Sequence, residues 1–255
     1  MTVELALTPD GRWPATQTEL VAASAAAGFS ALGVGMDRVD DSVVAAYREH
    51  GLRCHEVLAL LLDDDADATV AAAHRLADAA DAIRAEWVLT IFRTGLSPDS
   101  AKLIERCCAI FAEVGAGMAA EFSPLGPVST ISDAREIVRV GNRTGRAGVM
   151  IDSWHFSFGD STWADLAQLP LPEIAYVQFT DAMKPESDDL ARETMHRRAL
   201  PGVGVLELDR FASTLLDRGW DGTVSVEVLS AELRTLPVEE IVPRIHDATA
   251  PYWRR

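Results

Sequence analysis

The sequence predicts a single (β/α)8 barrel, an α/β fold, and three observations support this. Strand-like apolar runs alternate strictly with helical stretches, eight of each, and such alternation implies a parallel sheet. The 255 residues suit a closed barrel of eight units. No Gly-x-Gly-x-x-Gly motif follows the first strand, which disfavours an open dinucleotide-binding sheet. We therefore expect one domain over residues 1–255.

The expected strands are short apolar runs bounded by polar or turn-forming residues. In chain order they are Val3–Leu7, Ala31–Met36, Arg53–Leu62, Trp87–Phe92, Met118–Phe122, Gly148–Asp152, Ile174–Phe179 and Val224–Val228. Each of the eight runs is followed by a stretch with helical character. This regularity is what a barrel of eight βα units requires.

The expected helices span Gln17–Ala27, Asp41–His50, Asp65–Ala85, Pro98–Val114, Ser132–Thr144, Thr162–Ala167, Leu208–Arg218 and Val238–His246. Glycines at 28, 51, 115, 145 and 219 suit left-handed C-caps, and Pro98 after Ser97 suits a first helical turn. One connection is long: Met183–Leu206 is polar and then rich in Pro and Gly. Because it follows the seventh strand, it belongs to the face of a barrel where active sites lie.

Composition excludes several classes of protein. Hydrophobic residues make up 48% of the chain, enough for a large core, yet no apolar run approaches the roughly 18 residues that span a bilayer. The N-terminus lacks a secretory pattern, so we expect a cytoplasmic protein without a membrane partner. A net charge of −16 argues against nucleic acid. Cys54, Cys107 and Cys108 form no disulfide or metal pattern and are interpreted as reduced structural thiols.

Four polar residues stand near the ends of the last four strands: Glu121, Asp152, Gln178 and Glu227. Because side chains alternate along a strand, these four point inward together with Ala119, Met150, Tyr176 and Ser225. Three carboxylates brought together repel one another, and a cation relieves that repulsion. Carboxylate and amide oxygens are hard ligands. The sequence therefore predicts one divalent metal ion at these four residues, with Mg²⁺ or Mn²⁺ favoured over Zn²⁺.

Three further residues are candidates for substrate contact. His155 lies three residues past Asp152, although a lone histidine is often structural. Arg198 precedes the Pro-Gly-Val-Gly turn and is the best anchor for an anion, against the alternative of a solvated arginine. Asp181 follows the seventh strand and could equally cap the loop. His55 and Glu56 stand early in the third strand and are interpreted as structural.

The segments AAEFSP, GVMIDSWHF, YVQFTDA, RALPGVGVLELD and GTVSVEV resemble the xylose isomerase-like TIM-barrel superfamily. The resemblance is closest to its sugar phosphate isomerase/epimerase branch and is specific from about Met118 to Ser230. It implies metal ligation by Glu121, Asp152, Gln178 and Glu227, with His155 and Arg198 contacting substrate. Many members have histidine where this chain has Gln178, but hydroxypyruvate isomerase-like members also use glutamine. The endonuclease branch of the superfamily has a histidine-rich, multi-zinc site. Of the six histidines in this chain, only His155 and His196 stand near the expected active-site face, and this, with the acidic net charge, disfavours that branch.

The resemblance implies a metal-dependent isomerase or epimerase of a sugar, keto-sugar or inositol-type polyol in carbohydrate metabolism. Glu121 and Glu227 would act as the acid/base pair, abstracting a proton to give a metal-stabilised enediolate. A dehydratase of a cyclic keto compound such as 3-dehydroshikimate or inosose is the alternative, since the first step is shared. A non-catalytic metal- or ligand-binding barrel is a second alternative. The expected partner is a small polyhydroxylated molecule; self-association into a homo-oligomer is left open.

Overall fold

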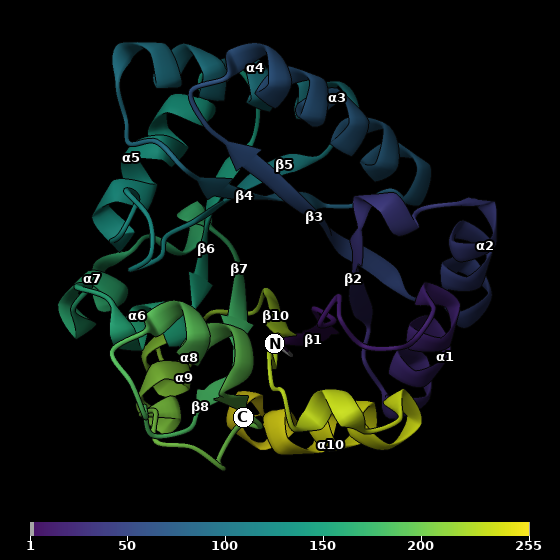
Figure 1. Cartoon of the computed structure of the whole chain (residues 1–255). Helices are drawn as coiled ribbons and strands as arrows, with labels where there is room; N and C mark the ends of the chain where they lie inside the picture. Colours follow the sequence, from purple (N-terminus) through teal and green to yellow (C-terminus); the bar gives the residue numbers. More distant parts are fainter. Residues whose placement is uncertain (1–2, 255) are drawn as a thin grey trace.

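A computed structural model describes residues 3–254, and its eight parallel main strands close into a barrel (Figure 1). The order around the barrel is β1, β10, β7, β6, β5, β4, β3, β2. The strands span β1 Glu4–Leu7, β2 Ala31–Gly35, β3 Arg53–Leu62, β4 Trp87–Phe92, β5 Gly117–Glu121, β6 Ala147–Asp152, β7 Ile174–Phe179 and β10 Thr223–Val226. The predicted (β/α)8 fold is confirmed, with each strand within two residues of its expected ends.

Helices surround the barrel, as Figure 1 shows in a view into its opening. The α-helices span α1 Gln17–Ala27, α2 Asp41–His50, α3 Ala66–Ile83, α4 Pro98–Glu113, α5 Ile131–Gly141, α6 Ser153–Phe158, α7 Trp163–Gln168, α8 Leu190–His196, α9 Leu208–Leu216 and α10 Val238–Thr249. Short 3-10 turns cover η1 Met36–Arg38, η2 Leu171–Glu173, η3 Leu233–Thr235 and η4 Ala250–Trp253. The sequence did not predict α6 and α8, which are short and rich in polar or aromatic residues.

The helix ends follow from local chemistry. Ser97 caps α4 through a hydrogen bond to the backbone of Ser100, with Pro98 in the first turn. Gly28 and Gly51 have positive φ angles, as expected for left-handed C-caps. Gly145 was expected to be such a cap, and this is wrong, because α5 ends earlier and the φ of Gly145 is not positive. Glycine is required there by close packing, since a Cβ would collide with the Cys108 carbonyl.

The strands divide the core into two layers. Outward-facing residues such as Val149, Ile151 and Val177 belong to the large cluster packed against the helices. Inward-facing residues, among them Ala119 and Met150, form a separate small cluster inside the barrel. This is the alternation expected from the sequence. It aims the polar residues that follow in the same strands at the barrel axis.

The long connection from 183 to 206 is folded rather than irregular. Asp181–Ala182 (β8) pairs antiparallel with Arg198–Ala199 (β9), and α8 lies between them. This arrangement returns the chain to the barrel, so Arg198 is 2% exposed. The connection therefore forms one side of the opening at the C-terminal ends of the strands.

No helix in the described part of the chain is long and apolar enough to cross a membrane. All three cysteines are free and buried. Burial raises the pKa of the Cys107 and Cys108 thiols to about 12. They are therefore protonated at neutral pH, in agreement with their interpretation as structural thiols.

Candidate active site

The four strand-end residues come from neighbouring strands in matched register. Asp152 pairs with Gln178, and Gln178 pairs with Ser225, two residues before Glu227. Glu121 pairs with Met150, two residues before Asp152. A barrel of this type has a shear of about eight residues over eight strands, so positions at one height advance by roughly one residue per strand. The staggered register therefore brings the four side chains together.

A cavity of about 650 Å³ opens at this end of the barrel. Glu121, Gln178 and Glu227 line it, together with His155 and Arg198. Asp152 is fully buried beside it. A second part of the wall is apolar and comes from β3, β4 and the loop after β5; it includes Leu58, Leu89, Ile91, Leu125 and Val128. The cavity thus has a polar wall at the strand ends and an apolar wall beside it.

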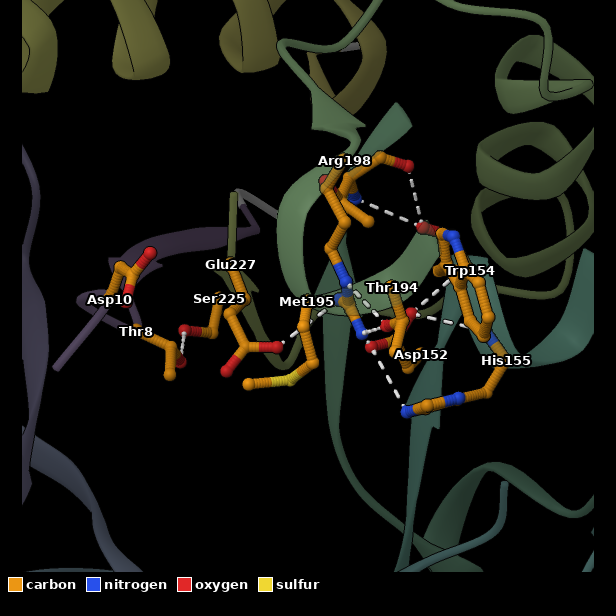
Figure 2. Close-up of polar contacts among 12 residues, drawn as sticks. Thr8, Asp10, Asp152, Trp154, His155, Thr194, Met195, Arg198, Ser225 and Glu227 are labelled. Carbon is orange, nitrogen blue, oxygen red and sulfur yellow. Dashed lines mark hydrogen bonds and ion pairs between the residues drawn. The ribbon is translucent and has the colours of Figure 1, made fainter. Parts of the chain in front are cut away.

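Arg198 joins two of the carboxylates. Its Nη1 lies 2.7 Å from Oδ2 of Asp152 and 3.1 Å from Oε2 of Glu227 (Figure 2). Its Nε and Nη2 donate to the hydroxyl of Thr194 on α8, at 3.2 and 3.0 Å. The folded connection therefore places a buried cation between carboxylates from two different strands. A solvated arginine, the alternative left open by the sequence, does not describe this residue.

His155 is positioned by the end of β6. Oδ1 of Asp152 accepts hydrogen bonds from the backbone N–H of Trp154 at 2.6 Å and of His155 at 3.3 Å, which caps α6. The Nε2 atom of His155 then lies 2.8 Å from Oε1 of Glu121. This contact links the helix after β6 to the end of β5. His155 therefore holds the Glu121 carboxylate at the edge of the cavity.

The three carboxylates of the site carry more negative charge than Arg198 alone neutralises. Burial, together with the nearby charges of Asp152 and Glu121, raises the pKa of Glu227 to about 8, although Arg198 opposes this shift. Burial also disfavours ionised Asp152, but Arg198, His155 and the backbone N–H of Trp154 hold its pKa below the usual range. A cation added to the cluster would stabilise the ionised form of Glu227.

The donor set fits a divalent ion, although the side chains pair with one another in this conformation. Within residues 3–254, no three His, Cys, Asp or Glu side chains are arranged as a finished metal site. Arg198 and His155 occupy the carboxylates instead. The Nε2 atom of Gln178 is buried without a hydrogen-bond partner among the described residues, so no hydrogen bond from this nitrogen fixes the amide beside the three carboxylates. Three carboxylates and one amide supply the hard oxygen donors that divalent ions prefer.

Asp181 lies outside the cavity lining and holds the loop. Its Oδ2 accepts from the backbone N–H of Gly202 at 3.1 Å and of Gly204 at 2.9 Å. Its Oδ1 accepts from Ala182 at 2.8 Å and Leu206 at 3.0 Å. Both oxygens are therefore committed to the backbone, and Asp181 is 2% exposed. The structure gives no support to the predicted substrate contact and favours the loop-capping alternative.

A layer of buried polar side chains lies inside the barrel next to the four strand-end residues, on the side of the N-terminal ends of the strands. The sequence did not predict how many residues take part in it. Glu56 is fully buried and accepts hydrogen bonds from the hydroxyls of Thr8 and Tyr176. The Thr8 hydroxyl also lies 2.6 Å from that of Ser225, two residues before Glu227. Nε2 of His55 lies 3.1 Å from Glu56. The layer links four strands or strand ends, which agrees with the structural interpretation of His55 and Glu56.

Arginines at the mouth were also missed. Arg12 follows β1 and Arg93 follows β4, and both line the cavity. They stand in loops with no periodic pattern, and their only signal in the sequence is their place just after a strand. In a barrel that place is the active-site face, so a search of every strand end for cations would have found them.

Comparison with known proteins agrees with the fold. A family described as xylose isomerase-like TIM barrel matches residues 19–248. The chain belongs to this family. The match covers most of the chain, including all four strand ends of the candidate site. It confirms the family resemblance that the motifs of the second half indicated.

Two curated relatives give narrower likenesses. An inosose isomerase of Halalkalibacterium halodurans is 31% identical over 137 residues, 53% of this chain and 47% of that protein. A 3-dehydroshikimate dehydratase of Pseudomonas aeruginosa is 31% identical over 110 residues, 43% of this chain and 17% of that protein. The aligned stretch thus spans about half the length of the isomerase and less of the dehydratase.

A solved structure of IolI protein with a bound zinc atom superposes with a TM-score of 0.85. It is 19% identical, and the superposition covers 98% of each chain. At this identity the likeness concerns the fold. The metal named in that structure is zinc, so the comparison gives no support to the expectation that Mg²⁺ or Mn²⁺ is favoured over Zn²⁺.

Proposed function

We propose that this protein is a divalent-metal-dependent isomerase or epimerase of a hydroxylated keto compound of the sugar or inosose class. One observation carries the proposal: Glu121 and Glu227 open onto the same cavity, with Gln178 also lining it and Asp152 paired beside Gln178. Two carboxylates facing one cavity suit removal of a proton from carbon and its return. The family, and relatives called inosose isomerase, support this class of activity.

Glu121, Asp152, Gln178 and Glu227 would hold the ion. When bound there, it supplies positive charge that polarises a carbonyl and makes the neighbouring C–H more acidic. Glu121 and Glu227 then act on the proton at that carbon: one glutamate removes it, and the other returns a proton. Return of the proton to the adjacent carbon, with the hydroxyl proton passing to the former carbonyl oxygen, isomerises the compound. Return to the opposite face of the same carbon epimerises it.

Two cationic or polar groups keep these glutamates in place. Arg198 lies 3.1 Å from Glu227, and His155 lies 2.8 Å from Glu121. Both also line the cavity, so each can orient a substrate oxygen while it holds its glutamate. The apolar wall beside them excludes water from that side, which strengthens the electrostatic interactions at the site.

A dehydratase is the second candidate, and the apolar wall favours it. Leu58, Leu89 and Ile91 offer no side-chain hydrogen bonds to hydroxyl groups. A ring hydroxylated at every carbon would therefore leave polar groups unpaired against this wall, at a cost. A partly deoxygenated ring fits it better, and one relative is called 3-dehydroshikimate dehydratase. Removal of the same α-proton followed by loss of a β-hydroxyl gives this outcome.

The test is a panel of keto-sugars, inososes and cyclic keto acids in D₂O with Zn²⁺, Mn²⁺ or Mg²⁺, followed by NMR. We expect deuterium to enter at the α-carbon of one class, and Glu227→Gln to lower the rate at least about a hundredfold, the lower range for loss of a general base. Glu207→Gln, a change at an exposed glutamate, is the control. Metal binding without exchange into any keto compound would indicate a non-catalytic barrel, and loss of water would identify the dehydratase.

A further inference from the structure

Arg12 is held rigidly at the mouth of the cavity. Its Nε and Nη2 donate to the two oxygens of Asp10, at 2.8 and 3.1 Å, and Nη2 also donates to the Met195 carbonyl at 2.9 Å. Asp10 is itself 1% exposed and receives Nε of Arg234 at 2.8 Å. Burial disfavours ionised Asp10, yet these arginines hold its pKa below the usual range. The charge of Arg12 is therefore fixed in position.

The Nη1 atom of the Arg12 guanidinium is free to bind a ligand. An arginine has five N–H donors, and two of them are on Nη1. Nη1 of Arg12 has no hydrogen-bond partner within residues 3–254, and the side chain is 35% exposed. Arg12 lines the cavity. The two free N–H groups on Nη1, fixed in position and part of a charged group, suit charge-assisted hydrogen bonds to carboxylate oxygens.

Arg93 adds a second cation to the same cavity. It follows β4, is exposed, and its side chain makes no hydrogen bond or ion pair in the described part of the chain. Asp10 also lines the cavity, but it is shared by Arg12 and Arg234, so this group keeps a net positive charge to which Arg93 adds. In a chain of net charge −16, these charges counteract the general repulsion of anions. Arg12 and Arg93 therefore make the outer part of the cavity attractive to an anionic ligand.

The charges along the cavity differ between its two ends. Glu121 and Glu227 lie at the strand ends, whereas Arg12 and Arg93 lie in the loops after β1 and β4. We propose that the substrate carries a carboxylate, which Arg12 binds at the mouth, with Arg93 adding positive charge to the same cavity, while the keto group faces the two glutamates. This inference rests on the proposed function and narrows its substrate to keto acids. The arginines then set the direction in which the substrate enters.

Arg234 supplies a matched control. It makes the same kinds of contact as Arg12, from Nε to Asp10 at 2.8 Å and from Nη2 to the Met195 carbonyl at 3.2 Å. It does not line the cavity. Loss of either arginine removes one partner of Asp10, but only loss of Arg12 removes a donor that faces the ligand. The pair separates a binding role from a structural one.

The experiment measures binding by calorimetry in the presence of Mn²⁺ to wild-type protein and to the variants Arg12→Gln, Arg93→Gln and Arg234→Gln. The probes are shikimate and glucuronate, each compared with its neutral methyl ester. We expect at least one acid to bind about tenfold or more tightly than its ester, as a charge-assisted arginine contact provides. Arg12→Gln should remove most of that preference, Arg93→Gln should reduce it, and Arg234→Gln should keep it.

The inference is overturned if neither acid is preferred over its ester, including the case in which nothing binds, or if Arg234→Gln loses as much preference as Arg12→Gln. Shikimate has no ketone or aldehyde whose α-proton could be removed, so its binding does not depend on catalysis. Deuterium exchange into keto compounds reports the proposed function separately. An acid preference without any exchange would therefore keep the anion site and reject the proposed reaction.

Discussion

At the scale of single residues, the site depends on how one buried cation is shared. Arg198 lies between Asp152 and Glu227, and Thr194 fixes the other side of its guanidinium. Removing one member of a buried ion pair leaves the other charged and without compensation. Asp152 has no exposed surface through which water could replace the lost partner. The stability of the fold and the geometry of the site are therefore coupled at Arg198.

We predict that Arg198→Gln lowers the free energy of unfolding by about 3–5 kcal/mol, the usual cost of breaking a buried ion pair. Urea denaturation followed by circular dichroism measures it. Arg210→Gln is the control, because Arg210 is 53% exposed and its 3.5 Å pair with Glu207 lies at the surface. Such surface pairs contribute about 0–1 kcal/mol. Equal midpoints for the two variants would contradict the account.

At the scale of elements, the connection between β7 and α9 is built around acidic side chains that accept backbone hydrogen bonds. Asp181 receives four backbone N–H groups, and Gly204 approaches it so closely that a Cβ there would collide with its carboxylate. Farther along, Glu193 receives the backbone N–H groups of Glu186 and Ser187, both at 3.2 Å. The loop is thereby fixed, and with it the position of Arg198.

We predict that Asp181→Asn speeds amide hydrogen exchange at Gly202 and Gly204, or at Ala182 and Leu206, since an amide group replaces one acceptor oxygen with a donor. Each buried N–H left unpaired costs about 1–3 kcal/mol. Mass spectrometry of the peptides covering 181–206 measures the exchange. Asp188→Asn is the control, because Asp188 is exposed in the same loop. Unchanged exchange in Asp181→Asn would show that the loop does not depend on this carboxylate.

The sequence identified the main strands because short apolar runs, such as residues 57–62, alternate with helical stretches along the chain. It identified Glu121 and Asp152 because carboxylates are unusual at the ends of such runs. It did not identify α8, whose seven residues are mostly polar, or the pairing of β8 with β9. Those depend on contacts between distant residues, including the ion pair of Arg198 with Asp152. For Asp181, the sequence left substrate contact and loop capping equally open, and only the contacts with residues 202, 204 and 206 distinguish the two.

At the scale of the whole molecule, the barrel brings three carboxylates and one amide from four strands, and arginines from the connecting loops, to one opening. The strand tilt aligns Glu121, Asp152, Gln178 and Glu227, while the loops after β1 and β4 carry Arg12 and Arg93. The buried layer of Thr8, Glu56, Tyr176 and Ser225 supports the site from below. In barrel enzymes in general, catalytic residues stand at the ends of the strands, and variation of the loops changes the specificity.

We propose that Glu121, Asp152, Gln178 and Glu227 together bind one divalent ion. The most direct measurement is anomalous X-ray scattering from crystals grown with ZnCl₂ or MnCl₂, collected on both sides of the metal's absorption edge. The account predicts a single strong peak at the end of the barrel, about 2.0–2.2 Å from oxygen atoms of the four side chains. A peak elsewhere, or no peak while Arg198 still joins Asp152 and Glu227, would contradict it.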